Sequence, residues 1–320
     1  MRPQSQEEHM NDTTQRQWRD ILILGAGELG MAVLEGFVKQ REMHPEMRLS
    51  VLLRPASLQR QQASDLARRR QLADWNIAIV SADFSRQSTQ QLAQCFAEYD
   101  AVINCSGFVG GPGTQLKITR AVLAAGVGRY IPWQFGVDYD RIGQGSGQPV
   151  WDEQLQVREL LRSQQQTRWV IVSTGMFTSY LFEPDFGVVD VPARRVLALG
   201  DADYALTLTT PQDIGTLTAA IFCHRPEYQN QVVYVAGDTL SYRQLAELLS
   251  RHYHQRFTLV VAERQTLRAA VDARPDDSAA AYRLAFARPD GVAWPLSTSY
   301  NARHGIALTD VKDWLVANAR

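Results

Sequence analysis

Short apolar runs alternate along the chain with longer segments whose apolar residues recur every three or four positions. The run DILIL at 20–24 leads into glycines, and the segment at 28–40 then has helical spacing. Short runs of this kind are typical of buried parallel strands. Further strands are predicted at 49–53, 77–80, 101–104, 130–133 and 169–173, and further helices at 57–72, 87–96, 115–125 and 150–162. The alternation predicts right-handed βαβ units and a doubly wound parallel sheet.

After about residue 175 the alternation becomes irregular. A segment at 232–236 is predicted to add one more strand to the same sheet, and helical patterns return at 242–253, 264–271 and 308–318. The sequence thus predicts a Rossmann-like α/β fold with two interleaved parts. The first is a nucleotide-binding domain over 19–175, and the second is a smaller C-terminal substrate lobe over 176–320. Residues 1–18 are polar and Gln-rich, and we expect them to form a disordered tail.

The composition of the chain argues against several classes of function. The 320 residues carry a formal net charge of -1 and contain no long basic run, which argues against a nucleic-acid partner. No apolar run is long enough to span a membrane, and the N-terminus has no secretory h-region. The three cysteines are widely spaced, with no CxxC and no Cys/His cluster. We therefore expect a cytoplasmic protein with reduced thiols and no metal site.

Lysine is scarce in this chain, and this restricts the possible chemistry. Of the 33 basic residues only Lys39, Lys117 and Lys312 are lysines, which leaves 30 arginines. Any mechanism that depends on a lysine must use one of these three. Lys117 is the only one that follows a predicted strand on the side where a cofactor would bind.

A glycine-rich turn joins the first predicted strand to the first predicted helix. Gly25, Gly27 and Gly30 fit the spacing GxGxxG, with Glu28 and Leu29 between the last two. In a strand–turn–helix context this spacing lets a backbone approach a pyrophosphate at a helix N-terminus. These five residues are therefore predicted to bind the phosphates of a dinucleotide.

The end of the second predicted strand indicates which dinucleotide is bound. NAD sites usually have an acidic residue here, but this chain has Arg54, followed by Ser57 and Arg60. A guanidinium can pair with a 2′-phosphate, so Arg54 and Ser57 favour NADP(H) over NAD(H). The basic run at 68–70 is expected to be a solvated helix face.

Ligands of open parallel sheets bind beyond the carboxyl ends of the strands. The residues there that we expect near the cofactor are Cys105, Ser106, Gln134, Gly175 and Met176. Those expected to line a pocket for a flat apolar or aromatic substrate are Phe108, Trp133, Phe177, Tyr180 and Phe182. The alternative is that these aromatic side chains only close the core between the two lobes.

The most distinctive stretches are GAGELG (25–30), VLLRP (51–55), AGVGRYIPWQFGVDYD (125–140), VREL (157–160), WVIVSTGMF (169–177), LGDADYALTLTTPQDIG (199–215) and RHGIAL (303–308). In this order the chain resembles the isoflavone reductase-like branch of the NmrA-like proteins. These are atypical short-chain dehydrogenases/reductases of the aromatic alcohol reductase type. The resemblance covers about residues 20–320. It implies an NADP-binding sheet with a small substrate lobe, and hydride transfer from NADPH to an aromatic substrate.

The resemblance also shows where this chain departs from the family. Those reductases carry a catalytic lysine shortly after an aromatic residue, on the helix that follows the fifth strand. Aligning Trp151 with that aromatic and Val157-Arg158 with the following Val-Arg puts Gln154 in the place of the lysine. An amide can orient a substrate by hydrogen bonds, but it cannot transfer a proton at neutral pH.

Another group must then supply any proton. We expect Gln154 and Tyr139 to be the catalytic pair, with Gln154 orienting the substrate and Tyr139 or water as the donor. Tyr180, His252 and His254 are alternative donors. The nearby Asp138 and Asp140 are expected to shape their loop through side-chain to backbone hydrogen bonds.

Two functions from different classes remain open. The first is an NADPH-dependent reductase of a small aromatic or apolar substrate with a carbonyl, alkene, imine or benzylic ether group. The second is a non-catalytic NADP(H)-sensing regulatory protein, which the missing lysine favours. An epimerase or dehydratase with tightly held NAD conflicts with Arg54. A homodimer is left open by the sequence.

Overall fold

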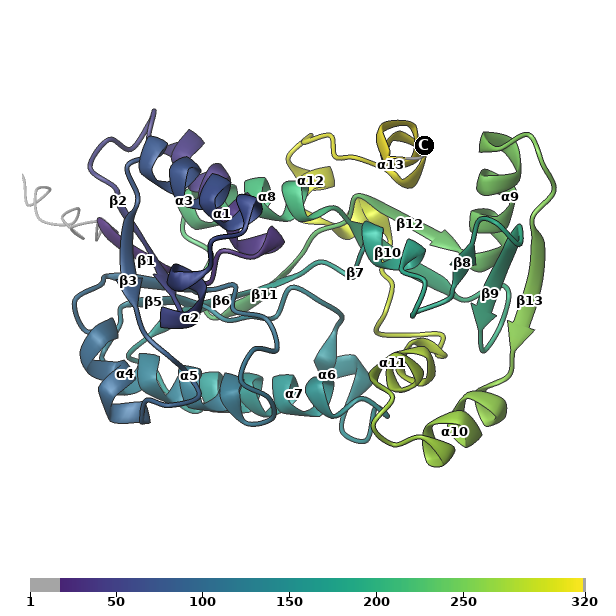
Figure 1. Cartoon of the computed structure of the whole chain (residues 1–320), viewed down its shortest axis with the longest axis horizontal. Coiled ribbons are helices and arrows are strands. Elements are labelled where there is room, and N and C mark those ends of the chain that lie inside the picture. The colour runs from purple at the N-terminus through teal and green to yellow at the C-terminus, as the bar shows by residue number, and fades with distance from the viewer. Residues whose placement is uncertain (1–17, 319–320) are drawn as a thin grey trace, which may run out of the picture.

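The computed structural model describes residues 18–318 and contains a seven-stranded parallel sheet between two layers of helices (Figure 1). Its strands are β1 (Asp20–Leu24), β2 (Arg48–Leu53), β3 (Ala78–Ser81), β4 (Ala101–Asn104), β5 (Arg129–Ile131), β6 (Arg168–Ser173) and β11 (Gln231–Tyr234). They lie in the order β3-β2-β1-β4-β5-β6-β11, and every neighbouring pair is parallel. The predicted Rossmann-like sheet is therefore confirmed.

This strand order reverses direction at the first strand. From β1 the chain moves outward through β2 and β3, and then returns to place β4 on the other side of β1. The loops after β1 and β4 consequently leave the sheet on opposite sides. Such a switch point opens a crevice at the carboxyl edge of the sheet, where ligands of this architecture bind.

Helices cover both faces of the sheet (Figure 1). One face carries α1 (Glu28–Gln40), α3 (Ala63–Asp74) and α8 (Pro211–Cys223), and the other carries α4 (Thr89–Phe96), α5 (Thr114–Ala124) and α7 (Pro149–Arg162). Helices α1 and α8 approach closely because glycines meet at their contact. A Cβ added to Gly36 would lie 2.4 Å from the carbonyl oxygen of Gly215.

The single helix predicted at 57–72 is wrong, because the segment forms two helices. Helix α2 (Pro55–Gln59) ends where Arg60 has extended backbone, and α3 begins at Ala63. Arg69 of α3 reaches back and donates hydrogen bonds to the carbonyls of Leu58 and Arg60, both at 2.8 Å. These bonds satisfy carbonyls that a continuous helix would have used, so the break is stable.

A smaller lobe lies beside the carboxyl edge of the large sheet (Figure 1). Two three-stranded sheets form it, in the orders β12-β10-β7 and β13-β9-β8. The strands are β7 (Met176–Phe177), β8 (Val189–Asp190), β9 (Arg195–Leu199), β10 (Ala205–Thr209), β12 (Asp238–Ser241) and β13 (Thr258–Ala262). The α-helices after β12 are α9 (Tyr242–His252), α10 (Arg264–Ala273), α11 (Ser278–Phe286), α12 (Tyr300–Arg303) and α13 (Val311–Asn318).

The chain returns from the small lobe to the large sheet. After β10 it forms α8, and then β11, which pairs in parallel with β6 so that Val232 lies opposite Ile171. Of the tail predicted at 1–18, residues 1–17 lie outside the described residues. Trp18 is buried, and its indole N–H donates to Glu227 at 2.5 Å. Within residues 18–318 no helix combines the length and apolar character needed to cross a bilayer.

Candidate functional site

The turn between β1 and α1 is built around glycines. Gly25 has φ +92°, a backbone conformation that favours glycine, and a Cβ on Gly30 would lie 2.1 Å from the Gly25 carbonyl oxygen. Gly27 precedes α1 with no side-chain cap, and a Cβ added to it would meet nothing within 4 Å. The N–H groups of Glu28, Leu29 and Gly30 thus begin the helix beside open space, as an anion-binding turn requires.

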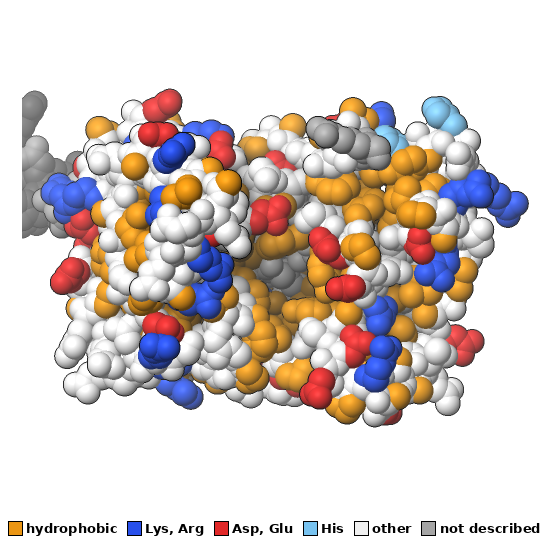
Figure 2. Space-filling view, viewed as in Figure 1, with side chains coloured by type: hydrophobic (Ala, Val, Ile, Leu, Met, Phe, Trp, Pro, Cys, Tyr) orange, Lys and Arg blue, Asp and Glu red, His pale blue; other side chains and the backbone are white. Residues whose placement is uncertain are grey.

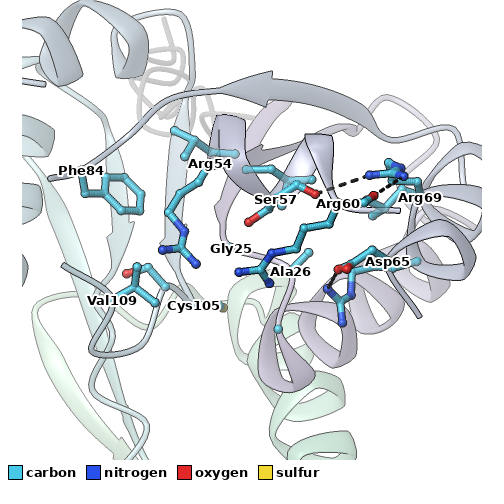
Figure 3. Close-up of a pocket in the computed structure, with 16 residues that line it drawn as sticks. Gly25, Ala26, Arg54, Ser57, Arg60, Asp65, Arg69, Phe84, Cys105 and Val109 are labelled. Atoms are coloured by element: carbon cyan, nitrogen blue, oxygen red, sulfur yellow. Dashed lines mark hydrogen bonds and ion pairs between the residues drawn. The ribbon is translucent and has the colours of Figure 1, made fainter. Parts of the chain in front are cut away.

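A basic cavity of about 260 Å³ lies next to this turn, at the carboxyl ends of β1, β2 and β4. Its lining is Gly25, Ala26, Gly27, Leu52, Leu53, Arg54, Ser57, Arg60, Asp65, Arg68, Arg69, Leu72, Phe84, Cys105, Ser106 and Val109. Arg54 and Arg60 both extend into it in Figure 3. Neither guanidinium has a hydrogen-bond or ion-pair partner within the described part of the chain. Two unpaired cations on one cavity wall favour an anionic ligand.

Contrary to expectation, two of the three arginines at 68–70 are not on a solvated helix face. Arg68 and Arg69 line the basic cavity. Arg68 lies 3.3 Å from Asp65, a carboxylate buried in the wall, and Arg69 is occupied with carbonyls of the α2 segment. These two arginines therefore brace the wall, whereas Arg54 and Arg60 remain available to a ligand.

The loop after β4 is held by a buried amide network. The Ser106 hydroxyl donates to Asn104 at 2.7 Å, and Asn104 donates to Gln115 at 2.8 Å. Gln115 in turn donates to the carbonyl of Gly107 at 2.6 Å. Cys105 lines the basic cavity, but burial raises the pKa of its thiol far above the ordinary value. It is therefore a packing residue and not a nucleophile.

An aromatic cavity of about 190 Å³ lies farther along the same sheet edge, beyond β5 and β6. Its lining is Trp133, Phe135, Gly136, Val137, Tyr139, Val150, Trp151, Gly175, Met176, Phe177, Tyr180, Tyr282 and Phe286. None of these side chains carries a charge. The rings of Trp151 and Phe286 meet edge to face at 4.9 Å, and Tyr180 meets Tyr282 at 5.9 Å. Such walls suit a flat apolar or aromatic ligand.

Several of these wall residues were absent from the predicted pocket, among them Trp151, Tyr282 and Phe286. Trp151 is on α7, whereas Tyr282 and Phe286 come from α11, more than a hundred residues after β5. Two residues predicted to line the substrate pocket do not line the aromatic cavity. Phe182 stacks on Trp314 at 4.7 Å and does not line the aromatic cavity, and Phe108 is 41% exposed and does not line it either. Phe182 finds a partner on α13 that local sequence could not indicate.

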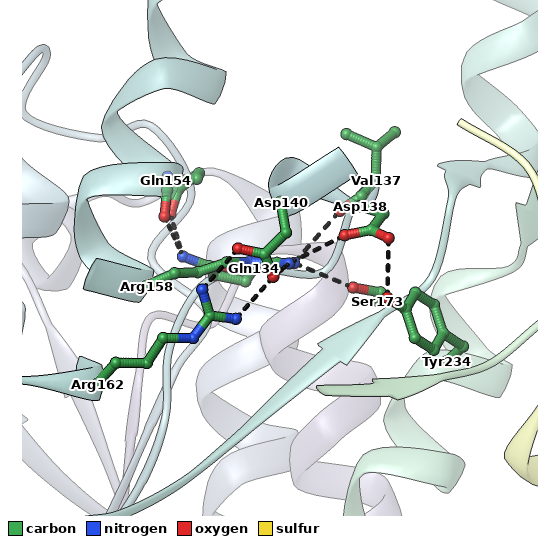
Figure 4. Close-up of polar contacts among 9 residues, drawn as sticks. All are labelled: Gln134, Val137, Asp138, Asp140, Gln154, Arg158, Arg162, Ser173 and Tyr234. Atoms are coloured by element: carbon green, nitrogen blue, oxygen red, sulfur yellow. Dashed lines mark hydrogen bonds and ion pairs between the residues drawn. The ribbon is translucent and has the colours of Figure 1, made fainter. Parts of the chain in front are cut away.

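The pocket loop, residues 132–138, links β5 to the short helix α6 (Tyr139–Ile142) and rests on a buried arginine (Figure 4). Arg158 of α7 is fully buried. Its Nε donates to the side chain of Gln134 at 2.8 Å, and its Nη1 donates to Asp140 at 2.7 Å and to Asp138 at 3.2 Å. It also contacts the face of the Tyr139 ring at 5.1 Å. Sequence reasoning missed this residue, although its motif was part of the resemblance.

Asp138 and Asp140 do not bond backbone groups as expected. Asp138 accepts from the Tyr234 hydroxyl at 2.8 Å, and Asp140 accepts two bonds from Arg162 at 2.6 and 2.7 Å (Figure 4). The hydrogen bonds from Arg162, followed by those from Arg158, lower the pKa of Asp140 to about 2. Both carboxylates thus neutralise buried or half-buried arginines, a role that the loop sequence alone could not reveal.

Gln154 lies beside the pocket loop but does not line the aromatic cavity. Its backbone carbonyl accepts from Gln134 at 2.7 Å, and its side-chain oxygen accepts from the same amide at 3.3 Å. Its own Nε2 is buried and has no partner within the described residues. Lys117 cannot replace a lysine at this place, because its Nζ donates to the carbonyl of Phe84 at 2.6 Å.

Of the four candidate proton donors, only two lie at the aromatic cavity. Tyr139 and Tyr180 line the aromatic cavity, whereas His252 and His254 stand at the end of α9 and do not. Tyr139 is only 6% exposed, and its hydroxyl has no hydrogen-bond partner between residues 18 and 318. Burial raises the pKa of the Tyr139 phenol and also that of Tyr180.

The remaining predicted cofactor residues fall on both sides of this crevice. Ser57 and Ser106 line the basic cavity, and Gly175 and Met176 line the aromatic one. Gln134 is buried beneath the pocket loop and lines neither of them. No group of three or more metal-ligating side chains occurs within the described residues.

The parallel sheet, the glycine turn and the crevice at the switch point define a Rossmann-like α/β protein with a second lobe. The model of the NmrA-like family matches residues 18–281, and the chain belongs to this family.

Individual relatives agree with that assignment, and a solved structure shares the fold. An NmrA-like family domain-containing oxidoreductase of Gibberella moniliformis is 41% identical over 92% of this chain and 97% of its own. Phenylcoumaran benzylic ether reductase Pyrc5 of Pyrus communis is 27% identical, over 71% of this chain and 72% of its own. The solved binary complex of leucoanthocyanidin reductase and NADPH from Vitis vinifera has a TM-score of 0.74 at 19% identity. It covers 93% of this chain and 98% of that one.

Proposed function

We propose that this protein is an NADPH-dependent reductase that transfers hydride to a small aromatic or apolar substrate. The observation that carries the proposal is the pairing of two different cavities along one sheet edge. One is basic and adjoins a glycine turn, and the other is aromatic and uncharged. A dinucleotide lying across the switch point would extend from the first to the second.

The basic cavity supports NADP(H) as the dinucleotide. The N-terminus of α1 would receive the pyrophosphate, and Arg54 and Arg60 would hold the 2′-phosphate from two directions. No acidic residue stands at the end of β2 to accept a ribose 2′-hydroxyl, and Asp65 is committed to Arg68. The NADPH complex of the reductase from Vitis vinifera, which shares the fold, is consistent with this assignment.

The aromatic cavity supports the substrate half of the proposal. Gly175 and Met176 follow β6 and would stand beside the nicotinamide, with Cys105 and Ser106 on the other side. The aromatic walls would hold a flat substrate against the hydride donor, so that orientation supplies much of the rate. Gln154 is buried behind the pocket loop and lines neither cavity, so the proposal does not depend on its amide.

The test has two stages. Dissociation constants for NADPH and NADH are measured by fluorescence, and NADPH oxidation is then followed with an aromatic aldehyde, an enone, an imine and a benzylic ether. Tight NADPH binding together with turnover of one class supports the reductase. Equal affinity for NADPH and NADH would contradict the NADP assignment.

A second function is favoured by one observation, that the only candidate proton donors at the aromatic cavity within the described residues are weakly acidic tyrosines. The family's lysine position holds Gln154, and Tyr139 has a raised pKa. A non-catalytic protein that senses NADP(H) would need no such donor. Tight NADPH binding without turnover of any substrate class, together with a co-purifying partner protein, would support that function over the reductase.

A further inference from the structure

A large cleft between the two lobes adjoins the aromatic cavity. This interlobe cleft has a volume of about 880 Å³, and Phe177 and Tyr180 line both spaces. Its lining is Glu28, Phe177, Ser179, Tyr180, Glu183, Pro184, Asp185, Phe186, Arg274, Asp276, Asp277, Ser278, Ala279 and Arg283. Figure 2 shows a hollow in the middle of this face, with hydrophobic side chains inside it, acidic side chains on its upper and right rim and basic side chains to its left.

The charge of the interlobe cleft is negative and uncompensated. Five carboxylates line it against two arginines. Arg274 pairs with Asp277 at 3.3 Å, and Arg283 donates to the backbone carbonyls of Asp185 and Phe186. The carboxylates without an ion-pair partner within residues 18–318 are those of Glu28, Glu183, Asp185 and Asp276. A cation entering the aromatic cavity would therefore pass an attractive field, and an anion a repulsive one.

A second observation inside the aromatic cavity points to a ligand with a polar group. Tyr139 lines the cavity and is only 6% exposed. Its hydroxyl oxygen has no hydrogen-bond partner within the described chain. This oxygen is not one of the fully enclosed polar atoms without a partner in the described residues, so it stays accessible from the cavity, where a polar group of a ligand can reach it. The lone pairs of the hydroxyl oxygen can face the positive charge of a ligand. Arg158 behind the ring is neutralised by Asp138 and Asp140.

Among the described residues, the only groups on the cavity walls that could protonate a product are weakly acidic tyrosines. No Lys, His, Asp, Glu or Cys lines the aromatic cavity, and its titratable groups are the tyrosines 139, 180 and 282. Burial raises the pKa of Tyr282 to about 12 and also raises those of Tyr139 and Tyr180. Hydride addition to a neutral carbonyl or alkene leaves an anion that must take up a proton. Hydride addition to a carbon that already bears positive charge does not.

We propose that the substrate is a cationic aromatic compound with an iminium group, C=N⁺, and this rests on the proposed reductase function. The hydride from the nicotinamide C4 forms the new C–H bond at the iminium carbon. The π electron pair of C=N becomes the lone pair of the amine nitrogen. NADPH is oxidised to NADP⁺, the iminium is reduced to an amine, and no proton leaves the protein. The aromatic walls also favour a cation through their ring faces.

The experiment compares probes of matched shape. N-methyl-3,4-dihydroisoquinolinium is the cation, 1-tetralone the neutral ketone and 2-naphthoate the anion. Binding to the NADP⁺-loaded protein is measured for all three, and NADPH oxidation is measured for the first two. We expect the cation to exceed the ketone about tenfold in kcat/KM at low ionic strength, with a preference that falls as salt is added. We expect 2-naphthoate to bind most weakly.

Variants then test the source of the preference. The triple change Glu183→Gln, Asp185→Asn and Asp276→Asn should lower the cation-to-ketone ratio of kcat/KM about tenfold. The matched control removes three exposed carboxylates elsewhere, by Asp201→Asn, Asp203→Asn and Glu247→Gln, and should leave that ratio unchanged. A ratio that falls equally in both variants would overturn the proposal.

The outcomes separate the two proposals. If the protein binds NADPH and reduces the ketone as fast as the cation, the iminium inference is overturned while the reductase stands. If NADPH is bound and neither probe is reduced, the iminium step is overturned, and the reductase is then decided by the panel of four substrate classes. If the cation binds no more tightly than 2-naphthoate, the assigned ligand charge is overturned whichever compound is turned over.

Discussion

The side-chain amide of Gln134 donates a hydrogen bond to the backbone carbonyl of Gln154 at 2.7 Å. The helix position that the resemblance assigns to a lysine is thus joined to the pocket loop through its backbone, which every residue type provides. The side chain of Gln154 contributes only an acceptor at 3.3 Å and a buried amide nitrogen without a partner in the described chain. Its replacement therefore leaves the loop anchored.

We expect Gln154→Met to leave the free energy of unfolding unchanged within about 1 kcal/mol, because an apolar group of similar size replaces an unsatisfied amide. Gln134→Met is the matched comparison. It loses the bonds to Gln154 and Arg158 and should cost about 2–3 kcal/mol. Urea unfolding measures both. Equal losses in the two variants would show that the Gln154 side chain supports the loop after all.

Arg54→Ala and Arg60→Ala should each weaken NADPH binding by about 10- to 100-fold, because each removes a charge-assisted bond worth about 1.5–3 kcal/mol. Affinity for NADH, which lacks the 2′-phosphate, should change little. Arg70→Ala removes an exposed guanidinium outside the basic cavity and serves as the control. Fluorescence titration gives the constants. A parallel loss for NADH would mean that these arginines act on the fold of the wall.

Arg158→Met should lower the free energy of unfolding by about 3–5 kcal/mol, because it leaves Asp138 and Asp140 without their buried cation. Arg243→Met provides the contrast. Arg243 pairs with Asp203 on the surface, where such pairs contribute about 0–1 kcal/mol. Thermal and urea unfolding measure the loss of stability in each variant. Loss of similar size in both would contradict the role given to Arg158.

The depressed pKa of Asp140 predicts a specific acid response. Its folded pKa of about 2 lies below the value in an unfolded chain, so the ionised carboxylate stabilises the fold at neutral pH. That contribution is full above about pH 4 and is lost as the pH falls toward 2. Asp140→Asn should therefore be less stable at pH 7 and should lose less stability than the wild type between pH 4 and 2. Parallel curves for the two proteins would rule this out.

Much of the sheet could be predicted because buried parallel strands and amphipathic helices leave periodic patterns. The glycine turn was equally clear, since close approach at Gly30 requires the absence of a side chain. The break between α2 and α3 left no such pattern. It depends on Arg69, which folds back across several residues to satisfy carbonyls of α2. A long flexible side chain can do this from many positions, so spacing does not reveal it.

The candidate site was harder to predict than the sheet, because its walls come from distant segments. Trp133 could be placed from its position after β5, but Tyr282 and Phe286 enter the aromatic cavity from α11. The burial of Arg158 also follows from tertiary packing, which the sequence around Asp138 and Asp140 does not reveal. Phe182 was expected to line the cavity, but it stacks on Trp314 instead.

The contact between Gly36 and Gly215 determines how much of the chain must be synthesised before the nucleotide-binding part can fold completely. Helix α8 must lie directly on α1, and β11 must close the sheet beside β6, yet both follow the first small-lobe strands in the chain. A fragment ending at residue 175 would leave Phe37 without its partner Phe222 and the outer edge of β6 open. During synthesis the nucleotide-binding half can therefore be completed only after residue 234 has left the ribosome, and the protein cannot be divided into two independently folding halves at that point.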